Sequence, residues 1–550
     1  MYMRARDAVQ AVALLVLCFA AMQASADAAV APAAGRRRRG SSGGVPQAVL
    51  AAFNPASHGG VDAAGGGNTG TGSRPRPPPP MRRQAPPRSF SRSAYATVLD
   101  RSLRFYEAQR SGQLPANNRV RWRRSAHLTD AVPGGYYDAG DYIKHSLTTA
   151  QASLFLAWAA LDFGTGMATA RQTAAAMAAV KWATDYLLNC SATPNQIVGL
   201  IGDPDVDHDY WGRPDEYTGP RRAYVWTRAM PASDLLGMTS AAMTSASLLF
   251  RKSNVSYADQ LLRKATELYS WGAAVQGLYS ESYPGYDSSL YATNRYCDKL
   301  LLAAAWLGRA TGNATYFGEA RQWWLAALEE DGGPNVFVSW DSVAPAAAEL
   351  LTGQAARLGA ARVPGAAAYG SFLDGAFLKS WSVADGTSSS YGVTQTPGGL
   401  RRPVWSRWGN TRYSCNAAFV ALLRAVQLSH TSQTRRSYVA FARSQLDYAL
   451  GSAGRSFVVG WGARPPLRAH HPGASCPGRP QPCGWDAFDS PAPNPLVLHG
   501  ALVAGPAGPG DDTYRDKRDD YVTNEVAIDY NSGFSGALAG MVQVLAPAAS

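Results

Sequence analysis

The chain has 550 residues, of which 46% are apolar and 10% aromatic, as in a large globular protein with a substantial core. Its formal charge of +12 is uneven, because residues 27–92 carry +8 and residues 93–550 only +3. The main part of the chain is therefore close to neutral, and its charge gives no support for nucleic-acid binding.

The first 26 residues have the pattern of a secretory signal peptide. Arg4 and Arg6 precede the apolar run Ala8–Ala21, and the following MQASA offers a cleavage site after Ala26. The run is shorter than the roughly twenty residues of a membrane span. We therefore expect a secreted protein without a stable membrane span, and an uncleaved signal anchor is the alternative.

Residues 27–90 are rich in proline, glycine and arginine, as in GRRRRGSSGG and GGGNTGTGSRPRPPPP, and they have no hydrophobic period. Such a segment cannot bury enough apolar surface to offset the cost of ordering it. We predict a disordered basic linker. It is either a passive tail or a segment that adheres to acidic polymers.

From Ser93 onward, apolar residues recur at i, i+3, i+4 and i+7 in one segment after another. The pattern predicts about twelve helices, over residues 93–110, 147–163, 169–188, 234–250, 257–272, 299–311, 314–328, 343–359, 368–382, 417–429, 435–451 and 532–545. Strand-like alternation is scarce, with residues 335–340 and 456–462 as the main exceptions. Most of the helices are apolar on more than one face, so we expect antiparallel pairs arranged in a ring.

The loop before the second predicted helix reads PGGYYDAGDYIKH and contains Asp138 and Asp141. At this spacing the two carboxylates can project from one side of a turn, orient one water molecule and remove its proton. The alternative is structural: an Asx-turn followed by a helix N-cap.

A second polar cluster, YRDKRDDYVTNEVAIDYNSGF, lies near the C-terminus. It places Glu525 between Tyr521 and Tyr530, and a carboxyl group among aromatic rings can have a raised pKa and act as a general acid. A surface carboxylate in a charged loop is the alternative.

His470 and His471 form a histidine pair between these clusters. The pair could bind a metal, cap a helix or contact a polyhydroxyl ligand, but no HExxH or paired CxxC motif accompanies it. From Ser93 onward the chain also lacks the GxSxG motif of serine hydrolases, and no part of it has the GxxxxGK[ST] motif of phosphate-binding loops. We therefore predict no metal site and favour acid/base chemistry by carboxylates.

The cysteines and the glycosylation sequons fit an exported protein. Cys476 and Cys483 flank the proline-rich CPGRPQPC, where a local disulfide is plausible in an oxidising compartment. Asn189, Asn254 and Asn313 each begin an Asn-x-Ser/Thr sequon and are glycosylation candidates.

An ordered series of motifs between about residues 93 and 545 resembles glycoside hydrolase family 9, the plant endo-β-1,4-glucanases (cellulases). The series runs RSLRFYEAQRSGQLP, NRVRWR, GGYYDAGDYIKH, GDPDVDHDYWGRPDEY, NRYCDKLLLAAAWLGRATGN, VSWDS, TPGGLRRPVWSRWGNTRYSCNAAF, SFVVGWG, RAHH, NPLVLHGALVAGP and Tyr514–Ser532. The resemblance implies that residues 91–547 are a catalytic domain with an all-α (α/α)6 barrel. Long loops on this toroid of six helix hairpins would form an open cleft.

The resemblance also assigns roles to individual residues. Asp141 corresponds to the general base, Asp138 to its partner in holding the water, and Glu525 to the proton donor. His470 and Asp516 match the other two positions of the active-site signatures. The residues expected to contact glucosyl units are His208, Trp211, Trp340, Asp341, Trp408, Arg412, Tyr413 and Tyr530.

The implied activity is that of an endo-1,4-β-D-glucanase (EC 3.2.1.4), which cuts internal bonds of cellulose-type cell-wall glucans with inversion. An inverting site needs its acid and base about 6.5–9.5 Å apart. We expect this distance between the carboxyl groups of Glu525 and Asp141. A same-mechanism hydrolase of xyloglucan, xylan or mixed-linkage glucan is one alternative. A wall-glucan-binding protein with impaired turnover is another.

The chain departs from the family pattern at several positions. Pro472 stands where the family has an arginine that contacts substrate, which is the basis of the impaired-turnover alternative. His145 replaces a phenylalanine, and Met238 and Lys299 each replace a glutamate.

The resemblance implies no required cofactor and leaves a structural calcium ion open, although no ligand cluster supports one. The expected partner is a β-1,4-glucan polysaccharide, and we expect a monomeric glycoprotein secreted to the apoplast or cell wall.

Overall fold

A computed structural model describes residues 89–286, 290–330, 334–383 and 388–546. These residues belong to the second of two units into which the chain divides, Arg82–Ser550. The predicted signal peptide (1–26) and nearly all of the predicted linker (27–90) lie outside the described residues, so both stay predictions.

Six of the long helices are buried almost all round. Every residue from Ser146 to Ala159 is buried, as is every residue from Ile528 to Val542. This explains why the sequence is apolar on more than one face of these segments. The six are α3 (Ser146–Asp162), α7 (Ser233–Phe250), α10 (Cys297–Thr311), α12 (Ala344–Leu358), α15 (Asn410–Gln427) and α20 (Ile528–Val544).

The other long helices are amphipathic and bury one face each. In α8, for example, Tyr257, Leu261 and Leu268 are buried at helical spacing while the opposite face is exposed. The outer helices are α2 (Arg92–Ala108), α5 (Thr173–Cys190), α8 (Val255–Ala274), α11 (Ala314–Glu330), α16 (Gln433–Leu450), and α13 (Ala366–Phe372) continued through the π-helical Leu373–Phe377 into α14 (Leu378–Trp381).

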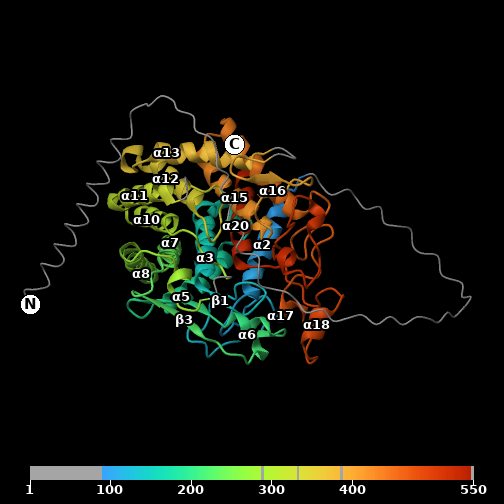
Figure 1. Cartoon of the computed structure of the whole chain (residues 1–550). Helices are drawn as coiled ribbons and strands as arrows, with labels where there is room; N and C mark the ends of the chain where they lie inside the picture. Colours follow the sequence, from blue (N-terminus) through green and yellow to red (C-terminus); the bar gives the residue numbers. More distant parts are fainter. Residues whose placement is uncertain (1–88, 287–289, 331–333, 384–387, 547–550) are drawn as a thin grey trace, which may run out of the picture. The chain divides into compact units, whose positions relative to one another are not determined.

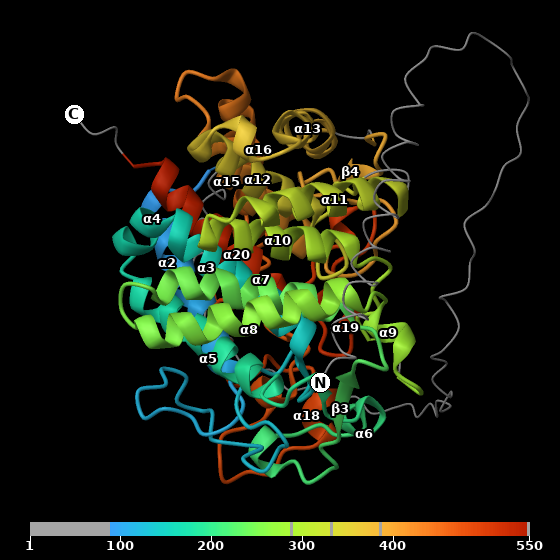
Figure 2. The same cartoon turned by 90° about the vertical axis from the view of Figure 1, so that its left-hand side faces the viewer.

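The inner helices close into a ring. Each packs on the next in the order α3, α7, α10, α12, α15 and α20, and α20 returns to α3. Figure 1 shows α3 and α20 side by side in the centre, and Figure 2 shows α8, α7, α10 and α11 in successive rows. The all-α (α/α)6 barrel is confirmed, and all twelve predicted segments are helical over most of their length.

The two segments with strand-like alternation are not strands of a sheet. Residues 336–339 are all buried, and the carbonyl groups of Val336 and Val338 accept hydrogen bonds from the side chains of Trp381 (2.9 Å) and Asn416 (3.0 Å) rather than from a strand. In the second segment, Val458 forms only an isolated bridge to Leu502. Consecutive residues are buried in both segments, so the alternation in the sequence does not mark one face of a strand.

The strands of the described residues lie elsewhere and are short. An antiparallel sheet joins β1 (Lys144–His145), β2 (Gln196–Ile201) and β3 (Ala223–Thr227), and a second pairs β4 (Val393–Gln395) with β5 (Arg401–Pro403). Short helices complete the loops: α4 (Gly164–Thr169), α6 (Pro204–His208), η1 (Pro214–Glu216), α9 (Tyr279–Ser282), η2 (Ala360–Arg362), α17 (Pro472–Ser475), α18 (Trp485–Asp489), η4 (Asp511–Thr513) and α19 (Tyr521–Asn524).

The barrel topology gathers the loops that precede the inner helices at one end. Outer and inner helices alternate along the chain, so the inner helices all run in the same direction and begin at the same end of the ring. The loop before α3 carries Asp141, the loop before α12 carries Asp341, the loop before α15 carries Trp408, and the loop before α20 carries Glu525. The fold thus brings together residues up to 384 positions apart.

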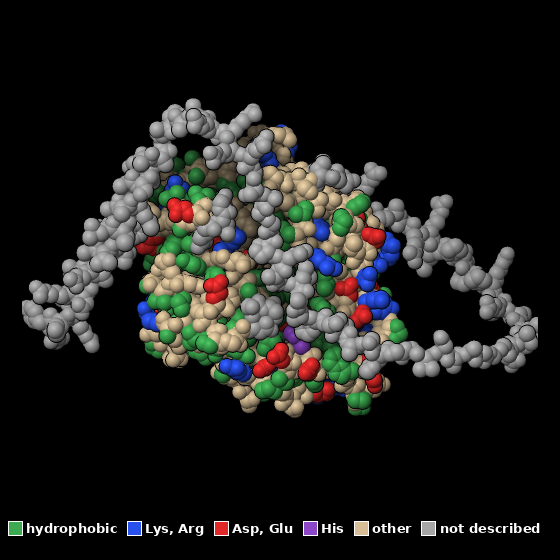
Figure 3. All heavy atoms as spheres, viewed as in Figure 1, with side chains coloured by type: hydrophobic (Ala, Val, Ile, Leu, Met, Phe, Trp, Pro, Cys, Tyr) green, Lys and Arg blue, Asp and Glu red, His purple; other side chains and the backbone are tan. Residues whose placement is uncertain are grey.

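The predicted disulfide between Cys476 and Cys483 is confirmed, with a Cα–Cα distance of 5.2 Å. The three sequon asparagines, Asn189, Asn254 and Asn313, are exposed, and their glycosylation stays a prediction. No helix among the described residues is long and apolar enough to cross a membrane. On the face shown in Figure 3, acidic and basic side chains are interspersed.

A fully buried ion pair anchors the loop that carries the two aspartates. The Nζ of Lys144 lies 2.7 Å from the carboxylate of Asp130, neither side chain is exposed, and Arg221 binds the same carboxylate at 3.0 Å. Burial alone would raise the pKa of Asp130, but Arg221 and Lys144 outweigh it and hold that pKa below its ordinary value.

We expect Asp130→Asn to lower the free energy of unfolding by about 3–5 kcal/mol, because it leaves the buried Lys144 ammonium without its counter-charge. Denaturant unfolding followed by tryptophan fluorescence measures the change. Asp185→Asn, in the exposed pair with Lys181, is the matched control and should cost less than about 1 kcal/mol. Equal losses in the two variants would contradict this assignment.

Candidate active site

Backbone contacts hold the loop of Asp138 and Asp141 against the segment of Glu525. The N–H of Ile528 donates to the carbonyl of Asp138 at 2.8 Å, and His470 pairs with Glu525 in a parallel bridge. A Cβ on Gly140 would lie 2.5 Å from the carbonyl oxygen of His470, so this close approach requires glycine. The acid and the aspartate pair therefore lie at one site.

Asp138 is the buried member of the aspartate pair and is only 3% exposed. Its carboxylate accepts a hydrogen bond from the hydroxyl of Thr148, on α3. Burial, followed by the charges of Asp529 and Asp141, raises its pKa well above the ordinary value. These contacts hold the carboxyl group in place and leave little of it open to solvent.

Asp141 is the accessible member, with 22% of its side chain exposed. One carboxylate oxygen accepts from the N–H of Ile143 at 3.3 Å, and the other lies 3.4 Å from Nε2 of His208. The hydrogen bond to Asp141 raises the pKa of His208 to about 9 despite partial burial, so the imidazole is cationic near neutral pH. A carboxylate that is open to solvent and supported by a cation has the properties of a general base.

Glu525 is partly buried, and its Oε2 accepts a hydrogen bond from Nε1 of Trp408 at 2.7 Å. The hydroxyl of Tyr530 lies 3.5 Å from the same oxygen. Burial raises the pKa of Glu525 to about 8, and the charges of Asp141 and Asp529 add to the rise, while the Trp408 bond opposes it. Glu525 is thus protonated at neutral pH, as a proton donor must be.

Asp529, which the sequence analysis did not single out, lies beneath the site without solvent exposure. It pairs with Nη1 of Arg412 at 2.8 Å, and its charge contributes to the raised pKa of both Asp138 and Glu525. The sequence shows that Asp529 lies four residues after Glu525, but it does not show that Asp529 pairs with Arg412.

Tyr291 was also missed. It hydrogen-bonds to Asp138, and its ring contacts Trp340 with centroids 5.3 Å apart. Its backbone has a φ of 55°, in the left-handed region that a tyrosine rarely adopts. Its only sequence signal was its place in a tyrosine-rich loop, so its contact with Asp138 depends on tertiary structure.

The two histidines of the predicted pair play different parts. His470 donates from Nδ1 to the carbonyl of Arg518 at 2.6 Å, and its ring packs on Trp211 with centroids 5.1 Å apart. His471 is buried and caps α17, because its Nδ1 accepts from the N–H of Ala474 at 3.0 Å. His470 lies beside the site, and His471 shapes the loop.

Asp516 positions other residues of the site. Its carboxylate accepts from the N–H groups of Leu467 (3.0 Å) and Arg468 (2.9 Å), which lead into His470, and from Nδ2 of Asn524 at 3.4 Å. These bonds join the two segments that carry His470 and Glu525.

The residues predicted to contact glucosyl units divide by exposure. His208 and Trp408 are well exposed, and Trp340 and Asp341 are partly exposed. Four others are at most 5% exposed and form the support beneath: Trp211, Arg412, Tyr413 and Tyr530. Arg412 in particular lies over the rings of Tyr413 and Tyr530, and its guanidinium forms an ion pair with Asp529.

The positions that depart from the family pattern are also buried. Pro472 opens α17, and Met238 lies in the core. Lys299 pairs with Asp298 at 3.0 Å, and Nε2 of His145 lies 2.9 Å from the hydroxyl of Tyr286. Among the described residues, no group of three or more His, Cys, Asp or Glu side chains is arranged to hold a metal ion.

Known proteins resemble this chain over most of its length. The model of glycosyl hydrolase family 9 matches residues 95–538. The chain is 36% identical to Endoglucanase 14 of Arabidopsis thaliana over 472 residues, which is 81% of this chain and 93% of that protein. It is 33% identical to Endoglucanase B of Cellulomonas fimi over 464 residues, which is 82% of this chain and 42% of that protein.

Among solved structures, the endoglucanase of the termite Nasutitermes takasagoensis is similar, with a TM-score of 0.74 and 39% identity over 82% of this chain and 99% of that one. The match to the family model includes the loops of Asp141 and Glu525. This chain therefore belongs to glycosyl hydrolase family 9 and is an endoglucanase.

Proposed function

We propose that this endoglucanase is secreted to the plant cell wall and cuts internal β-1,4-glucosidic bonds of cellulose-type glucans by inversion. The observation that carries the proposal is the contrast between the two carboxyl groups. Glu525 has its pKa raised to about 8, and Asp141 lies in the same site with part of its carboxylate open to solvent. The predicted signal peptide, the disulfide and the exposed sequons support secretion.

In the proposed reaction, Glu525 donates its proton to the glycosidic oxygen as the bond from that oxygen to the anomeric carbon breaks. Asp141 takes a proton from a water molecule, whose oxygen bonds to the anomeric carbon from the opposite face. The configuration inverts in one step, and the two carboxyl groups exchange protonation states. Room for that water requires the two carboxyl groups to lie about 6.5–9.5 Å apart.

The surrounding residues support this division of labour. Asp138, held by Thr148 and Tyr291, is the proposed second acceptor for that water, through the 3% of the residue that is exposed. The exposed ring of Trp408 offers an apolar face to a sugar while its Nε1 fixes the carboxyl group of Glu525.

Analysis of the first products tests the proposal. Proton NMR of a fresh digest of cello-oligosaccharides should show the α-anomer accumulating before mutarotation, and soluble cellulose should lose viscosity faster than reducing ends appear. Initial accumulation of the β-anomer would exclude inversion. Faster release of reducing ends from xyloglucan, xylan or mixed-linkage glucan than from soluble cellulose would make that polymer the preferred substrate. It would leave the proposed mechanism unchanged.

The hydrogen bond from Trp408 makes a testable contribution to the pH profile. Because kcat/KM requires a protonated Glu525, it should fall as pH rises through about 8. The Trp408 bond stabilises the charged carboxylate and lowers its pKa. In Trp408→Phe this alkaline limb should therefore move to higher pH.

Trp405→Phe is the matched control for this measurement. Trp405 precedes Trp408 in the same loop and is 59% exposed, and it contacts Phe337 and Tyr413 rather than Glu525. The pH profile of kcat/KM should not shift in this variant. A shift to lower pH in Trp408→Phe would contradict the assignment of the alkaline limb to Glu525.

A further inference from the structure

A cavity of about 180 Å³ lies next to the loop that carries the histidine pair. This volume is below the range of about 300–1,000 Å³ that is usual for drug-sized ligands, so the cavity suits about one sugar unit. Four segments supply its walls: residues 121–124, 213–215, 473–479 and Leu496. The lining side chains that matter most are Arg121, Trp122, Arg123, Arg124, Arg213 and Arg479.

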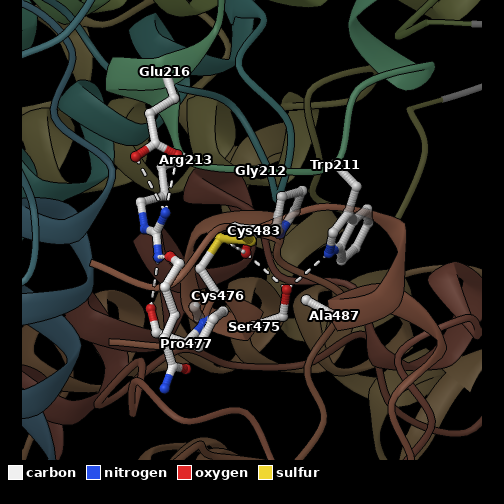
Figure 4. Close-up of a disulfide and its surroundings, with 12 residues drawn as sticks. Trp211, Gly212, Arg213, Glu216, Ser475, Cys476, Pro477, Cys483 and Ala487 are labelled. Atoms are coloured by element: carbon white, nitrogen blue, oxygen red, sulfur yellow. Dashed lines mark hydrogen bonds and ion pairs between the residues drawn. A yellow bond between two sulfur atoms is a disulfide. The ribbon is translucent and has the colours of Figure 1, made fainter. Parts of the chain in front are cut away.

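Two of the lining arginines are neutralised within the protein. Arg213 binds Glu216 at 2.9 Å, and Arg479 binds both Asp215 and Glu216. Figure 4 shows Arg213 between Glu216 and the carbonyl of Pro477, beside the disulfide. These two cations and two carboxylates balance one another and build the wall of the cavity.

The other three arginines form no ion pair with the described residues, although the charge of Asp215 acts on Arg123. Within the described ranges, no carboxylate lies within 4.0 Å of the guanidinium nitrogens of Arg121, Arg123 or Arg124. Arg121 and Arg124 are exposed at the rim. An anion that enters the cavity thus meets three unpaired cations.

Arg123 lines the cavity but is only 7% exposed, and its Nε, which has no hydrogen-bond partner, is itself closed to solvent. Its Nη2 donates to the carbonyl of Arg110 at 2.8 Å, and its guanidinium lies 5.3 Å from the centroid of the Tyr137 ring. A buried cationic N–H without a partner is costly. A carboxylate in the cavity would not reach this Nε, but its charge would offset part of the cost of burying the guanidinium.

Trp122 favours a carboxylated sugar over a small inorganic anion. Its indole lines the cavity beside the arginines and packs on His471 with ring centroids 6.3 Å apart. An aromatic face suits the apolar face of a sugar ring, whereas phosphate and sulfate have no such face. The cavity therefore combines the two contacts that a uronate unit needs.

The cavity and the active site share a wall. Trp211 packs on His470 and donates to the hydroxyl of Ser475 at 2.8 Å, while Arg213 and Gly473 of the same two segments line the cavity. We propose that this arginine cavity binds a carboxylate-bearing sugar unit of the polysaccharide and so directs the enzyme toward acidic glycans. The proposal extends the proposed glucan hydrolysis and rests on it for the β-1,4-glucosidic bond that is cut, whereas the carboxylate belongs to a substituted unit of the polymer.

Two soluble cellulose derivatives with the same backbone test the proposal: anionic carboxymethyl cellulose and neutral hydroxyethyl cellulose. The exposed rim arginines are replaced together, in Arg121→Glu/Arg124→Glu, because replacing the buried Arg123 risks misfolding. The KM for carboxymethyl cellulose should rise about fivefold or more, with little change for the neutral polymer. The difference should shrink in about 1 M salt.

Arg263→Glu/Arg362→Glu is the matched control, because it reverses the charge of two exposed arginines that do not line the cavity. It should change the KM of either polymer by less than about twofold. Equal effects of the two double variants, or equal effects on the two polymers, would overturn the proposal. If sulfate competes as strongly as glucuronate at equal ionic strength, the cavity is a general anion site. That result would also overturn the proposal.

Retardation in gels that contain either polymer separates this proposal from the proposed function. Hydroxyethyl cellulose reports hydrolysis independently of the cavity, so failure to cut it would count against the proposed function alone. Selective retardation by carboxymethyl cellulose, lost in Arg121→Glu/Arg124→Glu, would support the cavity even then. Equal retardation of wild type and the variant in both gels would refute it.

Discussion

Glu525→Gln is expected to lower kcat on soluble β-1,4-glucan by about two to four orders of magnitude, the usual contribution of a general acid. Glutamine has nearly the same shape, and its carbonyl oxygen can still accept from Nε1 of Trp408. The variant therefore loses the proton and keeps the local geometry. Release of reducing ends measures kcat, and calorimetry with a cello-oligosaccharide should give an affinity close to that of the wild type.

The leaving group gives a second test of the same residue. An aryl cellobioside with an acidic phenol needs little protonation when it departs, so Glu525→Gln should impair its hydrolysis far less than that of the natural glucan. Glu267→Gln on α8, whose side chain is 49% exposed, is the control and should leave both rates unchanged. Equal losses on the two substrates would mean that Glu525 does not act as the proton donor.

The helices were predictable because their signal is local. Burial on one side leaves a 3.6-residue period in the sequence, and burial on all sides leaves a long apolar segment. All twelve predicted segments are helices. The start of α15 at Asn410, seven residues before the predicted start, was missed because its first turn is polar. The strand-like alternation at 335–340 and 456–462 was misleading, because consecutive residues are buried in both segments and neither lies in a sheet of the described residues.

The candidate site was predictable only in part. The motifs identified Asp138, Asp141 and Glu525, which backbone contacts bring together. Asp529 and Tyr291 were missed because their importance comes from contacts with residues distant in the chain. No pattern in the sequence predicts that a carboxylate will be buried against an arginine more than a hundred positions away, as Asp529 is against Arg412.

Arg412 illustrates the same limit. By resemblance it is a substrate contact, but in the fold its guanidinium is buried and paired with Asp529. A charged side chain that is paired inside the protein acts on the reaction through its partner. Here the partner is Asp529, whose charge raises the pKa of Asp138 and of Glu525. The sequence identifies the charged residue, but the packing of the fold determines which residue it pairs with.

The second large effect is expected in Asp141→Asn, which removes the proposed base. The kcat on soluble glucan should fall by about two to four orders of magnitude, because asparagine cannot take a proton from the attacking water. Asp138 does not replace it, since it is almost fully buried and its hydrogen bonds are made to Thr148 and Tyr291. Reducing-end release measures the loss, and Asp259→Asn, on the exposed face of α8, is the control.

Azide distinguishes loss of the base from distortion of the site. It attacks the anomeric carbon without first losing a proton, so it should restore turnover in Asp141→Asn and yield a glycosyl azide of inverted configuration. The charge of Asp141 contributes to the raised pKa of Glu525, so the alkaline limb of the rescued reaction should move to lower pH. Recovery by azide without this shift would mean that the charge of Asp141 does not affect the pKa of Glu525. A rate unchanged by Asp141→Asn would assign the base to another residue.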